Sequence, residues 1–144
     1  STLSSSSAAS DVYKRQDVVD AAREALCACR LEAVAEAPVE SLAYGQRRQL
    51  EIAMALAGQP SVLLLDEPMA GMSAAESAGV IALLQSLKGR YTIVLVEHDM
   101  NAVFALADRI SVLVYGKIIA TGTADAIRNH PDVRRAYLGD DADA

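Results

Sequence analysis

Residues 62–68 read VLLLDEP, an apolar run that ends in two acidic residues and a proline. The unbroken run from Val62 to Leu65 is typical of a strand buried on both faces of a parallel sheet. In such sheets ligands gather at the carboxyl ends of the strands. Because Asp66 and Glu67 leave the strand toward opposite sides, one is expected to hold a hard cation while the other faces a water. The alternative is that both carboxylates only begin a solvated loop.

A second polar strand end follows along the chain, in the segment TIVLVEHD at residues 92–99. His98 lies two residues after this predicted strand, over 92–96, and is expected to reach the same crevice as Asp66 and Glu67. A neutral imidazole there can donate to a phosphate oxygen and orient an attacking water. The paired carboxylates and this histidine suit hydrolysis of a Mg²⁺-bound nucleotide. The alternative is that His98 is an ordinary loop residue with satisfied hydrogen bonds.

The third candidate is the segment SLAYGQ at residues 41–46, which ends where a helix is predicted over 46–57. A glycine beside the free N–H groups of a helix N-terminus makes an anion site, and the helix dipole favours a phosphate there. The alternative is an ordinary glycine-containing helix entry. The predicted helix places Leu50, Ala53, Met54 and Ala57 on one side.

The rest of the chain alternates helix and strand, which predicts a mostly parallel α/β sheet covered by helices. Residues 1–16 are serine-rich and are expected to form a non-native or disordered leader, the alternative being a short frayed helix over 11–16. A helix is predicted over 17–37, before Pro38. Ser73 and Glu76 form a predicted capping box, and the helix that follows buries Val80, Leu83, Leu84 and Leu87. A strand is predicted over 110–115, a tight turn at 116–117, and short helices near 124–129 and 132–138.

Composition narrows the possible functions. The 144 residues are 52% apolar and 4% aromatic, with a formal net charge of −6. An acidic, aromatic-poor chain argues against nucleic acid as a partner. Cys27 and Cys29 are too close for a disulfide framework and are expected to act as small apolar residues. The phosphate-cradling pattern G-x-x-x-x-G-K-[ST] does not occur in the sequence.

Taken together, the segments LAYGQRRQLEIAMAL (42–56), VLLLDEP (62–68) and VLVEHDM (94–100) resemble the C-terminal half of an ABC-transporter ATP-binding subunit. Their order and spacing match the signature segment, the Walker B strand and the switch-histidine segment of that family. Within it, LAYGQRRQLEIA, EHDM (97–100) and IRNHPDVRRAYLG (127–139) are most similar to subunits of branched-chain amino-acid importers. The resemblance implies a P-loop NTPase-like fold that is incomplete, because the N-terminal half with the phosphate loop is absent. It assigns 17–40 to the end of a helical subdomain and 41–144 to the C-terminal part of the ATP-binding domain.

Carried over position by position, the resemblance implies a role for each candidate residue. Asp66 would hold Mg²⁺, Glu67 would be the general base, and His98 would contact the γ-phosphate of ATP. The signature loop, which would press on the ATP of the opposite subunit, is formed by Ala43, Tyr44, Gly45 and Gln46. Ser73 falls in the D-loop of the family. The family usually has Ser at position 43 and Asp at position 73, so two contacts to the opposite subunit are in doubt.

The resemblance also implies partners and a location. The partners are a second ATP-binding subunit in a head-to-tail dimer, transmembrane permease subunits and, indirectly, a solute-binding protein. The implied location is the cytoplasmic face of the cell membrane. The parent subunit would hydrolyse ATP to drive import, while the chain alone is expected to be inactive. Three alternatives stay open: a catalytically silent fragment, the ATPase of a related importer such as one for urea, or a different α/β hydrolase. Part of the apolar surface is expected to be left uncovered without the absent half.

Overall fold

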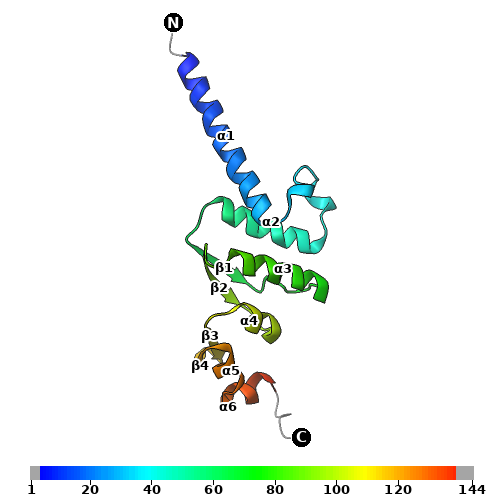
Figure 1. Ribbon diagram of the computed structural model, residues 1–144, viewed down its shortest axis with the longest axis vertical. Helices are drawn as coiled ribbons and strands as arrows, with labels where there is room; N and C mark the ends of the chain where they lie inside the picture. Colours follow the sequence, from blue (N-terminus) through cyan, green and yellow to red (C-terminus); the bar gives the residue numbers. More distant parts are fainter. Residues whose placement is uncertain (1–3, 139–144) are drawn as a thin grey trace. The chain divides into compact units, whose positions relative to one another are not determined.

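The computed structural model describes residues 4–138 of the chain. It divides after Val96 into two compact units, residues 1–96 and 97–144, and each unit is described by itself. The first unit holds the helices and strands α1 (Ser4–Ala28), η1 (Glu32–Val34), η2 (Val39–Ser41), α2 (Tyr44–Ala57), β1 (Val62–Asp66), α3 (Ala74–Leu87) and β2 (Thr92–Val96) (Figure 1). The second holds α4 (Met100–Leu106), β3 (Ile110–Val114), β4 (Lys117–Gly122), α5 (Ala124–Arg128), α6 (Pro131–Val133) and the π-helical turn η3 (Arg134–Leu138).

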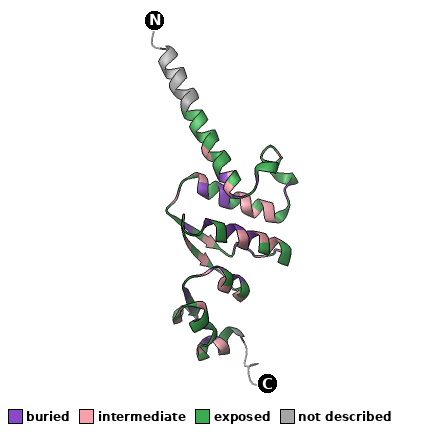
Figure 2. Cartoon of the chain, viewed as in Figure 1, coloured by how far each residue is buried: buried purple, intermediate pink, exposed green. Residues whose placement is uncertain are grey.

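The first helix differs from the prediction at both ends. Because α1 begins at Ser4, the segment expected to be a disordered leader is helical over 4–16, while residues 1–3 lie outside the described range. Extending an existing helix costs far less than starting one, so a serine-rich segment can continue a helix that the following residues form. Figure 2 shows residues 14–20 of α1 exposed and burial beginning near its C-terminal end.

The end of α1 is a Schellman motif, and the helix therefore stops at Ala28 rather than running to residue 37. The N–H of Leu31 donates to the carbonyl of Leu26 (2.9 Å) and that of Arg30 to the carbonyl of Cys27 (3.0 Å). Arg30 takes a left-handed φ of 58° to allow this. The reversal buries Cys29 and Leu31, which are 0% and 2% exposed. Burying both residues explains why the chain turns before Pro38.

Strands β1 and β2 form the parallel pair that the sequence predicted, with α3 as the connecting helix. The register joins Val62 to Thr92 and Asp66 to Val96. Helix α3 begins as expected, with Ser73 as its N-cap in a capping box with Glu76. Its predicted inward residues, Val80, Leu83, Leu84 and Leu87, are all buried. Helix α1 packs on α2, and α2 on α3 (Figure 1).

The prediction that β1 is buried on both faces is wrong. Leu63 is buried, whereas Leu64, pointing to the other side, is 73% exposed. The exposed face of the pair carries Val62, Leu64, Val94 and Val96. Alternation along a strand puts these side chains on one face, and no helix or strand of the first unit, over residues 4–96, covers that face. The expected uncovered apolar surface is therefore present on the sheet.

The second unit contains the predicted strand after α4, but the pairing of this strand within its unit is not the predicted parallel one. Instead β3 pairs antiparallel with β4. The turn between them, at Tyr115 and Gly116, has φ values of 47° and 76°. Two consecutive positive φ values match the tight turns that favour a hairpin. The core of this unit consists of Ile110, Val112, Ile127 and Val133. Gly139, the last residue of the segment IRNHPDVRRAYLG, lies outside the described residues.

Candidate functional site

The carboxyl ends of β1 and β2 lie level with each other. Asp66 is the last residue of β1 and pairs with Val96. The N–H of Glu67 donates to the carbonyl of Val96 over 2.9 Å, which continues the ladder for one more residue. Both acidic side chains are exposed. The strand ends thus present Asp66 and Glu67 to solvent at the edge where parallel sheets bind ligands.

Glu67 does not continue the strand, contrary to the assumption that placed the two carboxylates on opposite sides of an extended chain. Its φ is 44°, in the left-handed region. Its carbonyl accepts a hydrogen bond from the N–H of Ala70 (3.1 Å), which closes a turn over residues 67–70 that contains the buried Met69. A non-glycine residue in this region stores about 1–3 kcal/mol, and such residues cluster at functional sites. The conformation is therefore a second reason, besides charge, to regard Glu67 as functional.

The signature segment begins helix α2, as predicted, two residues earlier than its pattern indicated. Ala43 is the N-cap, and its N–H donates to Oε1 of Gln46 over 2.9 Å. This is one half of a capping box. The other half needs a side-chain oxygen at position 43, which alanine lacks. Tyr44, Gly45 and Gln46 are the first three helical residues, so their N–H groups have no acceptor within the helix.

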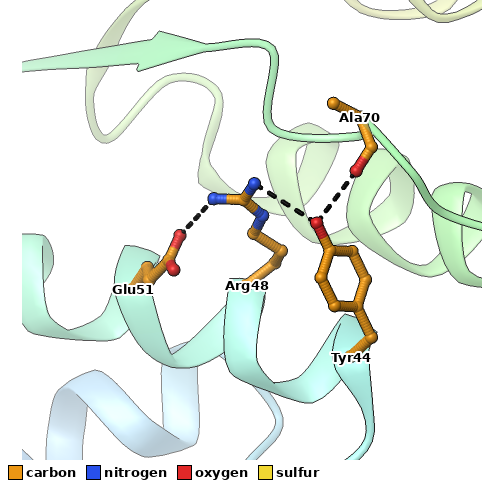
Figure 3. A network of polar contacts seen from close by, with 4 residues as sticks. All are labelled: Tyr44, Arg48, Glu51 and Ala70. Carbon is orange, nitrogen blue, oxygen red and sulfur yellow. Dashed lines mark hydrogen bonds and ion pairs between the residues drawn. The ribbon is translucent and has the colours of Figure 1, made fainter.

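Tyr44 ties the start of α2 to the segment after β1 (Figure 3). Its hydroxyl donates to the carbonyl of Ala70 over 3.1 Å and accepts from Nη2 of Arg48 over 3.4 Å. Arg48 is held in turn by an ion pair with Glu51 (2.7 Å). The tyrosine hydroxyl also lies 3.6 Å from where a Cβ on Gly71 would be, and Gly71 has a φ of 75°. The network fixes the tyrosine against Ala70 and Gly71.

Glu76 makes the second link between the same two segments. Its Oε1 accepts the N–H of Gly45 (3.3 Å), and its Oε2 accepts both the N–H (3.0 Å) and the hydroxyl (2.7 Å) of Ser73. The hydrogen bonds from the Ser73 side chain, then from the Ser73 N–H and then from the Gly45 N–H, lower the pKa of the Glu76 carboxyl from its ordinary value. The carboxylate therefore stays ionised between the N-termini of α2 and α3, where both helix dipoles favour a negative charge.

The sequence did not indicate the contacts that Glu76 and Tyr44 make between segments. It identified Glu76 only as the partner of Ser73, because the pattern S-x-x-E is local. The contact with Gly45 joins residues 31 positions apart. No periodicity or spacing signals such a pair. The signature glycine and the D-loop serine were both candidates, and the structure brings them together through one carboxylate.

His98 belongs to the second unit, so its predicted approach to Asp66 and Glu67 stays a prediction. Within its own unit the His98 side chain is exposed, and the backbone N–H of His98 donates to Oε2 of Glu97 over 3.2 Å. Asp99 follows as the N-cap of α4 and accepts from the N–H groups of Asn101 (2.9 Å) and Ala102 (3.3 Å). The histidine therefore lies in the short connection between β2 and α4, which ends at the N-cap residue Asp99.

Two features are absent from the part of the chain that the structure describes. Over residues 4–138, no group of three or more His, Cys, Asp and Glu side chains is arranged to hold a metal ion. No helix in that range has the length and apolar character needed to cross a membrane. Mg²⁺ is usually held by one or two carboxylates together with substrate phosphates, and therefore needs no cluster of three protein ligands.

Comparison with known proteins identifies the family. A model described as "ABC transporter" matches residues 2–70, and one described as "Branched-chain amino acid ATP-binding cassette transporter" matches residues 117–143. The chain is 47% identical over 102 residues to the high-affinity branched-chain amino acid transport ATP-binding protein LivG of Escherichia coli. It is 44% identical over 102 residues to the corresponding protein BraF of Pseudomonas aeruginosa. Each alignment covers 69% of this chain and 40% of the relative.

Solved structures agree with the sequence matches. The fold is similar to the ADP conformation of an ATP-binding cassette of an ABC transporter, with a TM-score of 0.77 and 27% identity. It is also similar to a nucleotide-free ATP-binding cassette, with a TM-score of 0.76 and 28% identity. Both comparisons cover 85% of this chain and 50% of the other. The chain belongs to the ATP-binding proteins of ABC transporters and has part of their P-loop NTPase fold. The expected family resemblance and α/β fold class are thus confirmed.

Proposed function

We propose that these residues form part of an ATP-hydrolysing subunit that energises import of branched-chain amino acids. The supporting observation is that β1, whose end lies level with that of β2, ends in Asp66 and Glu67, and that the segment after it is hydrogen-bonded at Ala70 to Tyr44 at the start of α2. The names of the relatives point to the same solute class. The chain spans 40% of the length of these relatives, so activity, solute and partners are all part of the proposal.

Each candidate residue has a role in the proposed reaction. Glu67 accepts a proton from, or polarises, the water that attacks the γ-phosphate, and His98 donates a hydrogen bond to a γ-phosphate oxygen. Residues 43–46, at the start of α2, contact the ATP of a second subunit through the helix dipole and the backbone N–H groups of Tyr44 and Gln46, since those of Ala43 and Gly45 are donated to Gln46 and Glu76. Ser73 contacts that second subunit from the D-loop position.

Asp66 is the residue that would hold Mg²⁺. It is an exposed carboxylate at the end of a strand, with oxygen donors of the kind this cation prefers. Mg²⁺ bound there would neutralise charge on the phosphates. The backbone of Asp66 is fixed by its pairing with Val96, so its carboxylate starts from a rigid position.

The test uses a hybrid in which this chain replaces the matching 102-residue segment of E. coli LivG. In that hybrid Glu67→Gln should lower ATP turnover by about 10²-fold or more while ATP binding is retained, because it removes the base and keeps the shape. Glu24→Gln is the matched control, since Glu24 is an exposed glutamate on α1. Near-normal turnover of Glu67→Gln would contradict the role of Glu67.

A second proposal is that the chain is catalytically silent alone and contributes only its signature face to a complete partner. The sequence has no G-x-x-x-x-G-K-[ST] pattern, which supports this. Titration of the isolated chain with a fluorescent ATP analogue tests it. We expect no saturable binding in the micromolar range, and micromolar binding would overturn this second proposal.

The proposed partners and location follow the family. They are a second ATP-binding subunit arranged head to tail, transmembrane permease subunits and, indirectly, a solute-binding protein. The subunit would lie on the cytoplasmic face of the cell membrane. Co-purification of the hybrid with the LivG permease partners, compared with intact LivG, tests this assignment. Loss of co-purification by a folded hybrid would count against it.

A further inference from the structure

The carboxylate of Glu76 connects the N-termini of α2 and α3, which are far apart in the sequence. Gly45 is the second helical residue of α2, and Ser73 is the N-cap of α3. Oε1 of Glu76 accepts from the first (3.3 Å) while Oε2 accepts twice from the second (3.0 and 2.7 Å). Each carboxylate oxygen thus serves a different segment, and neither oxygen can be removed without loss of one link.

The packing around this contact leaves little freedom. A Cβ on Gly45 would lie 3.3 Å from Cγ and 3.5 Å from Cβ of Glu76, so the glycine lets the glutamate approach the helix end. The hydroxyl of Tyr44 makes a parallel link to the carbonyl of Ala70 (3.1 Å). Two adjacent residues of α2 are therefore bound to two points of the segment 70–76. A two-point connection restrains rotation as well as distance.

We propose that Glu76 is a positioning residue that holds the signature loop and the D-loop position as one rigid element. The inference rests on the proposed function, because it matters for turnover only if both segments face the nucleotide of a second subunit. In that setting, the bonds of Glu76 to Gly45 and Ser73 fix how far apart the two segments lie when the partner subunit docks. The glutamate acts through Gly45 and Ser73 and is not itself placed on the nucleotide.

The link itself is tested by NMR on the 144-residue chain. An amide proton that is hydrogen-bonded to a carboxylate changes its chemical shift when that carboxylate titrates. We expect the amide protons of Gly45 and Ser73 to titrate together, with one midpoint below the ordinary glutamate value of 4.5. Glu76→Gln should abolish the shared titration, because the amide side chain does not ionise. The matched Glu24→Gln variant should leave it intact.

The role in turnover is tested in the LivG hybrid. Glu76→Gln keeps one acceptor oxygen, so it must lose the bond to Gly45 or those to Ser73. We expect kcat to fall about 10-fold with the KM for ATP little changed, as when a group is held out of place rather than removed. Equal circular dichroism spectra for wild type and variant show that the fold is kept.

The outcomes separate this inference from the proposed function. If the amide protons of Gly45 and Ser73 do not titrate together, the link is absent and the inference fails. If they do, yet Glu76→Gln turns over ATP normally while Glu67→Gln does not, the inference fails and the proposed function stands. If Glu67→Gln also turns over normally, the proposed function fails and only the structural link remains.

Discussion

The backbone N–H of Glu67 donates a hydrogen bond to the carbonyl oxygen of Val96 over 2.9 Å. This bond lies one residue beyond the last pair of the parallel ladder, Asp66 and Val96. It holds Glu67 at the end of the sheet even though its φ of 44° has left the strand conformation. Because the bond uses only backbone atoms, the position of residue 67 does not depend on its charge.

Glu67→Gln should therefore leave the fold and its stability nearly unchanged. The side chain is exposed, and exposed substitutions usually change the free energy of unfolding by less than about 0.5 kcal/mol. Urea unfolding followed by circular dichroism measures this in the isolated chain. A loss above about 1.5 kcal/mol would show that the carboxylate is structural, and the turnover test of Glu67 would then lose its meaning.

Ala43→Ser should stabilise the first unit. Gln46 already accepts the N–H of residue 43, and a serine hydroxyl would complete the capping box by accepting an N–H of the first turn of α2. An N-cap serine is worth about 1 kcal/mol relative to alanine. The free energy of unfolding in urea measures the gain. Ala43→Val, which adds bulk without an acceptor, should give no gain, and an equal gain for both variants would contradict the explanation.

Arg30→Gly should also stabilise the first unit. Arg30 occupies the left-handed position of the Schellman motif with a φ of 58°, which costs an L-residue about 1–2 kcal/mol and a glycine far less. After the extra entropy of glycine in the unfolded chain, a gain of about 0.5–1 kcal/mol remains.

The opposite substitution at a matched position serves as the control for Arg30→Gly. Gly89 has a φ of 86°, and a Cβ there would meet no atom within 4 Å. Gly89→Ala should therefore lose about 1 kcal/mol through backbone strain alone. Thermal unfolding of both variants is the measurement. If both substitutions destabilise, φ does not decide stability at these positions.

Much of the fold could be predicted from local patterns. The strand 92–96, the cap at Ser73 and the buried face of α3 all depend on residues within a few positions of one another, and all three are confirmed, although the strand was expected to be buried and Val94 and Val96 are exposed. The strand ends at Asp66 and Glu67 were likewise visible as a change from apolar to acidic residues. Such signals are strong where one secondary-structure element has one covered face.

Predictions failed where the outcome depended on which surfaces meet. Met54 was predicted to share one side of α2 with Ala53, yet Met54 is exposed, whereas Ala53, Ile52 and Leu56 are buried. The helix has apolar residues on several sides, so its periodicity alone does not choose the buried one. The hydrogen bond between Gly45 and Glu76 could not be predicted from the sequence for the same reason, because it depends on two helix ends meeting in space.

Acid should selectively remove the stabilisation contributed by Glu76. The pKa of its carboxyl is lowered in the folded chain, mainly by the Ser73 hydroxyl, so the contribution is fully present above the ordinary value of 4.5. It is lost as pH falls through the lowered folded value. Wild type should therefore exceed Glu76→Gln in urea stability at pH 7, and the difference should shrink below pH 4.5. A difference that is independent of pH would contradict the assignment.

The two cysteines should react with thiol reagents at very different rates. Cys27 is exposed and Cys29 buried, and burial raises the pKa of the Cys29 thiol to about 11. Only the thiolate reacts, so in the native chain at pH 8 one thiol should be alkylated and Cys29 should follow only in urea. Mass spectrometry after timed alkylation separates the two sites.

Substitution of Glu32 tests what limits the reactivity of the exposed thiol, that of Cys27. A hydrogen bond from the Cys27 thiol to the Glu32 carboxylate, and then the negative charge itself, raise the pKa of Cys27 above its ordinary value of 9.0. Glu32→Gln removes the charge, so the pKa should fall, the thiolate fraction at pH 8 should rise, and Cys27 should be alkylated faster. The rate at Cys29 should not change, because its thiol is shielded by burial rather than by charge. Equal acceleration at both sites would mean instead that the substitution loosens the turn after α1.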